Sequence, residues 1–476
     1  MDRDRMQKII ARYGEPFLKM KTALKLNCTC LCKLLKSSWR VRYIRPLKRY
    51  ERYSVFGTWV ELREDAVLNR LKALAMTVAP SDCDRTLICT ALTHAALNGI
   101  VRLFRCEIGI DNFPLPPCRF IHLRDHLLVF DKDARRFNGV PFSPEFNSRN
   151  RINLPYNPEA KCPRFINDLV LPMLENKDDL LLIQLYFGQC LLHANISQTF
   201  LIISGPAEIG KSVLVNIIEA IVGSENVTEL HLDRLASPFE LAEYASKILL
   251  TAKDVNNDAL SANNINALKK YTGNDLLTAE QKNRNSRIYV RGNFNIIITG
   301  NGDLALNLGN SRDAFKRRMI WIDCRKPENF KRIEGFDKLL LDEEREGILA
   351  WGIDGALKLL CSGGIIVKGK KQEEAIEYLL DESSPVETFI RERVVYDPDN
   401  SILSRDVVPA FYNFARYIGW NNDAVVHLSP RQIEQRFSQG MLRLRPECRY
   451  STNIKVPGSM KLLRGYMHCK ICDIKF

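Results

Sequence analysis

The residues with the clearest chemistry form an eight-residue segment in the middle of the chain. Gly205 and Gly210 permit a tight loop whose backbone N–H groups turn toward one centre. Lys211 then supplies a cation for terminal phosphates, and the hydroxyl of Ser212 can ligate Mg²⁺. The segment therefore predicts a phosphate-binding loop for a nucleotide. Its residues are Gly205, Pro206, Ala207, Glu208, Ile209, Gly210, Lys211 and Ser212.

Regular structure on both sides must position this loop. The apolar run 200–204 predicts a strand that leads into it, and the apolar spacing of 213–223 predicts a helix that leaves it. Such a helix directs the positive end of its dipole at the phosphates. Three more short apolar runs follow, at 247–251, 294–299 and 319–322, with helical patterns between several of them. This alternation predicts an α/β fold with a mainly parallel sheet.

Polar residues stand at the ends of two of these strands. Asp254 closes the strand that begins near residue 247, where a carboxylate would be a second protein ligand of Mg²⁺. Asn301 follows the run 294–299, where an amide beside the terminal phosphate would orient the attacking water. Taken alone, Asp254 fits equally well the start of a polar loop, because many strands end in this way.

Two adjacent arginines, Arg317 and Arg318, come just before the strand 319–322. In ring-shaped motors such an arginine reaches into the neighbouring subunit's site and neutralises transition-state charge. A finger of this type is worth about 10³–10⁵ in rate. For an isolated Arg-Arg pair, a solvated surface is the better interpretation, so both interpretations stay open on these residues alone.

Positive charge is concentrated at the N-terminal end. The formal net charge is +13, and residues 1–52 hold fifteen Lys or Arg against four acids, which leaves about +2 for the other residues. This distribution favours attraction to a polyanion such as nucleic acid. A targeting leader and a basic surface without a partner are the alternatives.

The fourteen cysteines favour reduced core thiols over a disulfide framework, because most stand singly among apolar neighbours, as Cys89 and Cys190 do. Two clusters could instead bind a metal. They are Cys28, Cys30 and Cys32 near the start and His468, Cys469 and Cys472 near the end. No apolar run reaches 18 residues and the N-terminus lacks a signal-peptide core. We therefore expect no membrane span, and an intracellular protein whose compartment the sequence leaves open.

Taken in order, these segments resemble the superfamily 3 helicases, and in particular the helicase portion of phage, plasmid and poxvirus primase–helicases. The resemblance spans roughly residues 127–440 and rests on the loop together with weaker motifs in the expected order. These motifs are Leu154–Pro163, Leu182–Gly188, Phe239–Ala242, Leu268–Asp275, Ala279–Lys282 and Asp313–Arg318. The resemblance implies an AAA+-like P-loop ATPase core that binds ATP and Mg²⁺. It also implies a homo-hexameric ring on single-stranded or forked DNA.

The resemblance assigns roles to individual positions around the nucleotide. Lys211 would bind the ATP phosphates, Ser212 and Asp254 would hold Mg²⁺, and Asn301 would be the sensor. One departure concerns Val255, because related helicases often carry a second acid directly after the first. The single acid indicates slow hydrolysis or the use of another base.

Further positions would act outside the chain's own nucleotide site. Arg318, or its neighbour Arg317, would act on the adjacent subunit's nucleotide. Lys282 and Arg284 would lie on a hairpin in the ring channel and grip phosphates of one DNA strand. Without the family, an ordinary solvated turn would be the preferred interpretation of that pair.

The same resemblance, with composition, divides the chain into five expected segments. The N-terminal region would be helical, and the C-terminal segment would be a small helical, winged-helix-like domain in which Arg431 and Arg436 face either DNA or solvent. The acidic triad of a primase is missing from the first 125 or so residues, so priming is not expected. The segments are a basic arm at 1–52, a helicase-associated N-terminal domain at 53–175, the ATPase core at 176–330, a helical extension at 331–378 and the C-terminal domain at 379–476.

The leading hypothesis is an ATP-hydrolysing DNA helicase that serves replication of a virus, phage or plasmid-like element, with a separate primase or polymerase as partner. A second hypothesis is a nucleotide-binding ring that acts as a scaffold or loader with little ATP turnover. A P-loop kinase or GTPase is disfavoured, because no guanine-reading Asn-Lys-x-Asp segment is present. A kinase would also have no need of Asn301 and the arginine pair.

Overall fold

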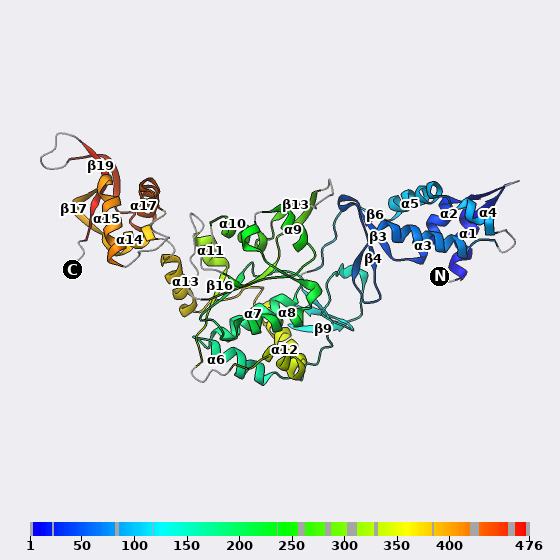
Figure 1. Cartoon of the computed structure of the whole chain (residues 1–476), viewed down its shortest axis with the longest axis horizontal. Helices are drawn as coiled ribbons and strands as arrows, with labels where there is room; N and C mark the ends of the chain where they lie inside the picture. Colours follow the sequence, from blue (N-terminus) through cyan, green and yellow to red (C-terminus); the bar gives the residue numbers. More distant parts are fainter. Residues whose placement is uncertain are drawn as a thin grey trace.

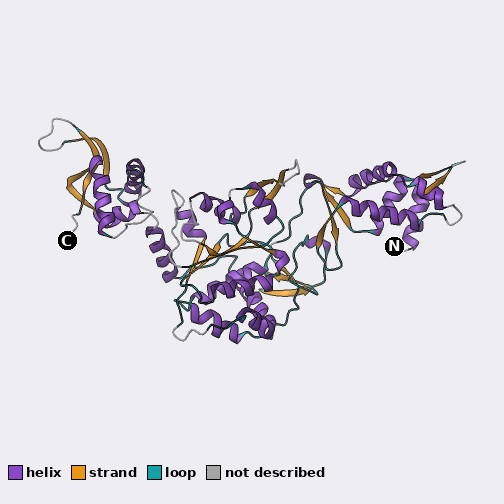
Figure 2. Ribbon diagram, viewed as in Figure 1, coloured by secondary structure: helices purple, strands orange, loops and turns teal. Residues whose placement is uncertain are grey.

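The computed structural model describes most of the chain. Its elements gather in three units along the sequence, which can be followed by colour in Figure 1 and by element type in Figure 2. The described residues are 3–20, 23–80, 85–117, 119–235, 237–255, 262–280, 287–301, 312–327, 332–382, 385–418, 428–455 and 462–472.

The N-terminal unit packs helices against a small four-stranded sheet. Its elements are α1 (Arg3–Tyr13), β1 (Phe17–Lys19), β2 (Leu24–Leu26), α2 (Cys28–Ser38), β3 (Val41–Ile44), η1 (Arg45–Leu47), β4 (Arg49–Tyr53), β5 (Trp59–Leu62), α3 (Glu64–Thr77), α4 (Arg85–Ala91), α5 (His94–Ile108) and β6 (Gly109–Ile110). Leu31 and Leu34 of α2 share a buried core with Val101 and Phe104 of α5. Residues of the predicted basic arm thus belong to this core, and the boundary expected after residue 52 falls inside β4.

A buried carboxylate ties this unit to the segment that follows it. Glu51 accepts hydrogen bonds from Arg42 and from Arg149, whose Nε lies 2.9 Å from Oε1, and it also pairs with Arg49. Burial alone would raise the pKa of Glu51, but the hydrogen bonds and charges of the three arginines lower it. Part of the N-terminal positive charge is therefore neutralised inside the protein.

The central unit is built around a five-stranded parallel sheet, which confirms the α/β fold predicted from the sequence. A three-stranded antiparallel sheet precedes it, with β7 (Phe120–His122), β8 (Leu127–Asp131), β9 (Arg136–Val140) and η2 (Pro144–Phe146). The central elements are η3 (Phe165–Val170), α6 (Leu171–Met173), α7 (Asp179–Leu191), β10 (Phe200–Ser204), α8 (Lys211–Val222), η4 (Ser224–Asn226), β11 (Val227–Glu229), η5 (Leu232–Arg234), α9 (Pro238–Tyr244), β12 (Leu249–Val255), α10 (Ala262–Thr272), β13 (Leu276–Glu280), β14 (Arg287–Arg291), β15 (Asn295–Gly300), α11 (Arg312–Arg318), β16 (Met319–Asp323), α12 (Phe336–Cys361) and α13 (Lys370–Glu382). The sheet order is β11-β12-β15-β10-β16, and β11 was not predicted.

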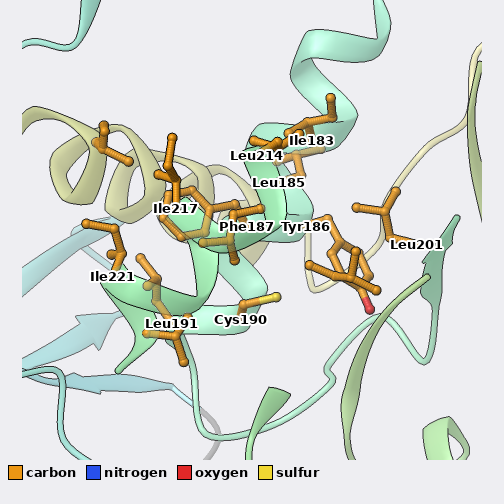
Figure 3. Close-up of a cluster of buried hydrophobic side chains, with 14 of the residues drawn as sticks. Ile183, Leu185, Tyr186, Phe187, Cys190, Leu191, Leu201, Leu214, Ile217 and Ile221 are labelled. Atoms are coloured by element: carbon orange, nitrogen blue, oxygen red, sulfur yellow. The ribbon is translucent and has the colours of Figure 1, made fainter. Parts of the chain in front are cut away.

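A separate hydrophobic cluster covers each face of this sheet. Along β10, Leu201 and Ile203 point into one cluster, while Phe200 and Ile202 point into the other. The first cluster is closed by α7, α8 and α12 (Figure 3), and the second by α9, α10, α13 and the paired strands β13 and β14. A strand buried on both faces is apolar at every position, which explains why β10 was recognisable from its sequence.

Helices α7 and α12 approach each other closely at glycines. A Cβ built on Gly355 would lie 2.1 Å from the carbonyl oxygen of Gln184, and one on Gly188 would lie 2.1 Å from the backbone nitrogen of Ala356. Backbone atoms cannot yield as the end of a flexible side chain can. Glycine is therefore required at both positions because the two helix backbones are too close for a side chain, and not because of an unusual φ angle.

Replacing Gly355 with alanine is expected to destabilise the protein by about 1–3 kcal/mol, because the added methyl group forces the two helices apart. Thermal or urea unfolding would measure the change. Gly99→Ala is the matched control, since Gly99 lies in α5 and nothing stands within 4 Å of the position that an added Cβ would take. That change should be neutral or stabilising by up to about 1 kcal/mol through helix propensity. Equal stability of the Gly355 variant and wild type would contradict the packing.

The C-terminal unit alternates helices with a three-stranded antiparallel sheet ordered β17-β19-β18. Its elements are α14 (Pro385–Arg393), β17 (Val394–Leu403), α15 (Ser404–Tyr417), α17 (Pro430–Leu444), β18 (Arg449–Ile454) and β19 (Leu463–Ile471). The core contains the aromatic rings of Phe389, Phe411, Phe414 and Phe437. The helices were predicted near these places, whereas the strands were not.

Every described cysteine is a free thiol. Cys190 is buried as predicted, but the prediction was wrong for Cys89, which is exposed. Burial raises the pKa of Cys30 and of Cys32 to about 11, which suits core residues more than metal ligands. Within the described ranges, neither this cluster nor the one around Cys469 forms a group that could hold a metal ion.

Among the helices that the structure describes, none is by itself long and apolar enough to cross a membrane. One pair, α4 with α5, reaches the required length and apolar content together across a bend of 60°. Its residues Ile88, Ile100 and Phe104 are buried in the N-terminal core.

Candidate functional site

The loop 205–210 borders a cavity of about 850 Å³ at the carboxyl edge of the parallel sheet. Helix α8 begins directly after the loop, so its N-terminus forms part of the cavity wall. Gly205 and Gly210 have φ angles of +146° and +105°, which residues with side chains rarely adopt. The backbone therefore turns tightly at both glycines, as the sequence predicted for these two positions.

Lys211 is almost completely buried at 3% exposure. Its ammonium group donates to the carbonyl oxygens of Gly205, at 2.8 Å, and Pro206, and to Oδ1 of Asn301 at 3.0 Å. Burial lowers the pKa of Lys211, and the carboxylate of Asp254 partly offsets this. Phosphate oxygens are stronger acceptors than carbonyls, so an anion in the cavity could take over these bonds.

Ser212 and Asp254 place two oxygen donors side by side on the cavity wall. The hydroxyl of Ser212 donates to Oδ2 of Asp254 at 3.4 Å. Mg²⁺ binds through few protein oxygens, keeps several waters and takes phosphate oxygens as further ligands. In the described part of the chain, no group of three or more His, Cys, Asp or Glu could form a closed metal cage. The donor pair therefore fits a magnesium ion that is held jointly with a nucleotide.

Asp254 sits on a β-bulge. Strand β12 pairs regularly with β15 up to Ala252 and resumes only at Val255. Asp254 has a left-handed φ of +52°, and its N–H donates to Oγ1 of Thr299 at 2.9 Å. Beyond the bulge, Val255 packs against the second hydrophobic cluster. An acid at position 255 would therefore not stand beside Ser212, which gives a structural reason for the missing second carboxylate.

Strand β15 lies between β12 and β10 and reaches both sides of the site. Thr299, near its end, holds the backbone of Asp254, and Asn301, just beyond it, accepts from Lys211. The structure thus brings together the four polar residues predicted for the nucleotide site from three separate stretches of sequence. They are Lys211, Ser212, Asp254 and Asn301.

Other parts of the cavity wall were not predicted. Asp168, Leu169 and Pro172 come from η3 and α6, and further residues come from the connection between β16 and α12. Asn216 of α8 donates to Oδ2 of Asp337 at 3.0 Å, which joins α8 to the start of α12. The sequence around the start of α12 has a glycine before Phe336 and an acid in the first turn. This pattern predicts the start of a helix, but it does not predict that the segment binds a ligand.

The arginine pair lies at the amino ends of the parallel strands, whereas the cavity lies at their carboxyl ends. Arg317 and Arg318 end α11 just before Met319, the first residue of β16, which pairs with Phe200 at the start of β10. Neither arginine lines the cavity. A five-residue strand at about 3.3 Å per residue separates them from it by roughly 16 Å. Arg317 is exposed, and Arg318 is partly buried, which lowers its pKa.

The predicted DNA contacts are only partly described. Lys282 and Arg284 lie outside the described residues, between β13 and β14, which pair antiparallel. In the C-terminal unit, Arg431 is exposed in the first turn of α17. Arg436 is partly buried, and burial lowers its pKa while Glu387 opposes the shift. Of these two arginines, Arg431 is the one with an open surface.

The matching family model is described as a family of unknown function (DUF5906) and covers residues 203–318. This range begins in β10 and ends with Arg318, so it includes the loop, Asp254, Asn301 and both arginines. A curated relative, the uncharacterized mitochondrial protein ymf21 of Marchantia polymorpha, is 32% identical over 112 residues. That match spans 23% of this chain and 62% of the relative's own length.

The fold has counterparts among solved structures. The apo structure of the C-terminal region of NrS-1 overlays 92% of this chain and 98% of its own, with a TM-score of 0.53 and 13% identity. Two structures of the A form of the same region give TM-scores of 0.48 and 0.49. At 13% identity the first overlay shows a shared fold over most of the chain.

Proposed function

We propose that the chain is an ATP-dependent DNA helicase of the superfamily 3 type, with an AAA+-like P-loop ATPase core. One observation carries the proposal: Lys211, Ser212 and Asp254 line one cavity beside a glycine loop and a helix N-terminus, and Asn301 accepts a hydrogen bond from Lys211. The order of motifs along the sequence supports this superfamily over a kinase or GTPase. The sheet order supports it too, because it places the polar tip of β15 between the loop strand and the acid strand.

In this proposal the loop N–H groups and Lys211 bind the ATP phosphates, and Ser212 with Asp254 holds Mg²⁺. A bound Mg²⁺ would neutralise charge on the phosphates. When Lys211 turns toward phosphate it releases the amide of Asn301, which then orients the attacking water. Thr299 keeps Asp254 at its bulge and so fixes the metal-binding oxygen relative to Lys211.

The proposed arginine finger acts between copies of the chain. Arg317 and Arg318 stand roughly a strand length from their own cavity, so they cannot reach a nucleotide bound there. In a ring of identical copies, the same surface meets the cavity of the next copy around the ring. We therefore propose a homo-hexamer in which Arg318 or Arg317 neutralises charge on the neighbour's terminal phosphate.

The DNA would be contacted by two further elements. The described elements of the C-terminal unit run helix–strand–helix–helix–strand–strand, the order of a winged helix, and α17 with Arg431 would be its recognition helix. Lys282 and Arg284 would grip phosphates of a single strand in the ring channel. We propose that this activity serves replication of a virus, phage or plasmid-like element, with a separate primase or polymerase as partner.

Forked-duplex unwinding and DNA-stimulated ATP hydrolysis by the full chain test the proposal directly. The expected result is that both require ATP with Mg²⁺ and that both rise with single-stranded DNA. The alternative, a nucleotide-binding scaffold or loader ring, is favoured by the single acid at Asp254. It would bind ATP and DNA while hydrolysing and unwinding nothing, so this pattern in wild type would replace the helicase proposal.

Replacing Lys282 with alanine is expected to weaken single-strand binding and to flatten its salt dependence. One lost phosphate contact should reduce the slope of log affinity against log salt by roughly 0.7. Fluorescence anisotropy at several salt concentrations measures both quantities. Lys132→Ala removes an exposed lysine from the β8–β9 turn and is the matched control, with an unchanged slope. An equal slope in wild type and the Lys282 variant would remove this residue from the DNA path.

A further inference from the structure

The connection between α12 and α13 passes around the edge of the central sheet. Strand β16 is the last strand of that sheet, so one of its edges has no neighbouring strand among the described residues. Ile366, before the crossing, is buried in the first hydrophobic cluster. Ile376 and Leu380 of α13, after it, are buried in the second. The chain is therefore held on both faces, and the residues between these anchors lie beside β16 and α11.

Lys368, in this crossing segment, caps α11. Its Nζ donates to the carbonyl oxygens of Lys316 at 2.6 Å and of Arg317 at 3.0 Å. The last carbonyls of a helix have no partner within the helix, and they form the negative end of its dipole. The ammonium group of Lys368 supplies a hydrogen-bond donor for these carbonyls and a positive charge at the negative end of the dipole. It does so at the turn that carries Arg317 and Arg318.

Helix α13 adds two further contacts to the same region. The side-chain amide of Gln372 accepts from the N–H of Trp321 at 3.2 Å and donates to its carbonyl oxygen, as a neighbouring strand would do. Glu377 pairs with Lys316 at 2.6 Å. Since α11 has only seven residues, its end depends on these contacts and not on its own length.

We propose that Lys368 is a positioning residue for the arginine pair, which it holds at the angle required to reach the neighbouring copy's nucleotide. The inference rests on the proposed function, because it needs a phosphoryl-transfer site shared between copies. Lys368 itself touches no nucleotide, since it lies with the arginines at the amino ends of the strands, away from the cavity. It acts through the backbone of α11.

This capping has a pH dependence. Burial lowers the pKa of Lys368 to about 8, the charge of Glu373 opposes this shift, and the charge of Lys316 adds to it. Rising pH therefore removes the charge from the cap near pH 8, and turnover should fall there. The folded state releases this proton more readily than the unfolded chain does, so stability does not decrease over that window. The expected fall in turnover is thus separable from unfolding.

Lys368→Met tests the proposal in the full chain by DNA-stimulated ATP turnover from pH 6.5 to 9. We expect kcat to fall by between about 10-fold and 100-fold, with nucleotide affinity unchanged and the step near pH 8 lost. Lys368→Arg keeps the charge and should retain most of the activity without that step. Lys370→Met is the matched control with wild-type turnover, because Lys370 is a neighbouring, 90% exposed lysine.

Mixing the Lys368→Met and Lys211→Ala proteins gives the decisive result. In mixed rings, intact loops of the first variant meet well-positioned arginines of the second. Turnover should rise to roughly a quarter of the wild-type value if assembly is random. An active wild type whose Lys368→Met variant keeps full turnover, or is not rescued by mixing, would overturn the positioning role alone. An inactive wild type would instead overturn the proposed function.

Discussion

Replacing Lys211 with alanine is expected to lower ATP turnover by about 10²–10³ and to reduce unwinding with it. Lys211 is the side chain that donates to the loop carbonyls and to Asn301, whereas Arg332, also on the cavity wall, pairs with Glu208. Loss of one preorganised charge at a developing negative centre costs about 10²–10³ in kcat. The measurements are steady-state hydrolysis with single-stranded DNA and unwinding of a forked duplex.

Thermal unfolding separates this loss from misfolding. Burial already disfavours the charged form of Lys211, so the alanine variant should unfold near the wild-type temperature when ATP is absent. At ATP one hundred times its Kd, wild type should gain about 2.7 kcal/mol and the variant much less. Lys132→Ala, which removes an exposed lysine from the β8–β9 turn, is the matched control. Hydrolysis and strand separation that both survive Lys211→Ala would reject the motor assignment.

The arginine pair should give the second large effect. Substituting alanine for whichever of Arg317 and Arg318 reaches the neighbour is expected to lower kcat by about 10³–10⁵, because transition-state charge then has no cation beside it. Binding of ATP to the chain's own loop should change little, since both arginines stand at the far edge of the sheet. Turnover and nucleotide affinity measured separately for each variant check both statements.

Arg405→Ala is a suitable control for the arginine variants, because it removes an exposed arginine from the C-terminal unit. Its turnover should stay within about twofold of wild type, as is usual for a surface position. The decisive comparison is the double variant that lacks both Arg317 and Arg318. If that protein had the wild-type kcat, the hypothesis of a site shared between copies would be rejected. Each copy would then hydrolyse ATP without an arginine from its neighbour.

The central sheet could be predicted because burial on both faces leaves a strong signal. Phe200–Ile203 is apolar throughout, and a glycine loop and an apolar helix follow it directly. The N-terminal unit gave a weaker signal. Its strands have two to five residues and include Arg42, Arg49 and Arg52. Such short, basic segments lack the apolar pattern of a strand, so their pairing into a sheet was not predicted. The sequence also could not indicate that buried Glu51 neutralises part of this charge.

The site was predictable to the extent that its residues are adjacent in sequence or end a strand. Asp254 and Asn301 were found because each follows a buried strand. The bulge that turns Asp254 toward Ser212 was not foreseen, since it arises from pairing between β12 and β15. The cavity wall from α12 and the cap by Lys368 depend on how distant segments pack, and no local pattern encodes them. The catalytic and DNA-binding roles remain predictions.

Strand β15 also sets a constraint on how the site can respond to a ligand. Thr299 and Asn301 are two residues apart, so one buried strand contacts both Asp254 and Lys211. With β10 and β12 bonded along both of its edges, β15 has little freedom to shift alone. The distance between acid and lysine is thus set before any phosphate arrives. Phosphate binding then requires only side-chain rotations. We expect Lys211 to exchange its present hydrogen-bond acceptors for phosphate oxygens rapidly and to bind the phosphate tightly.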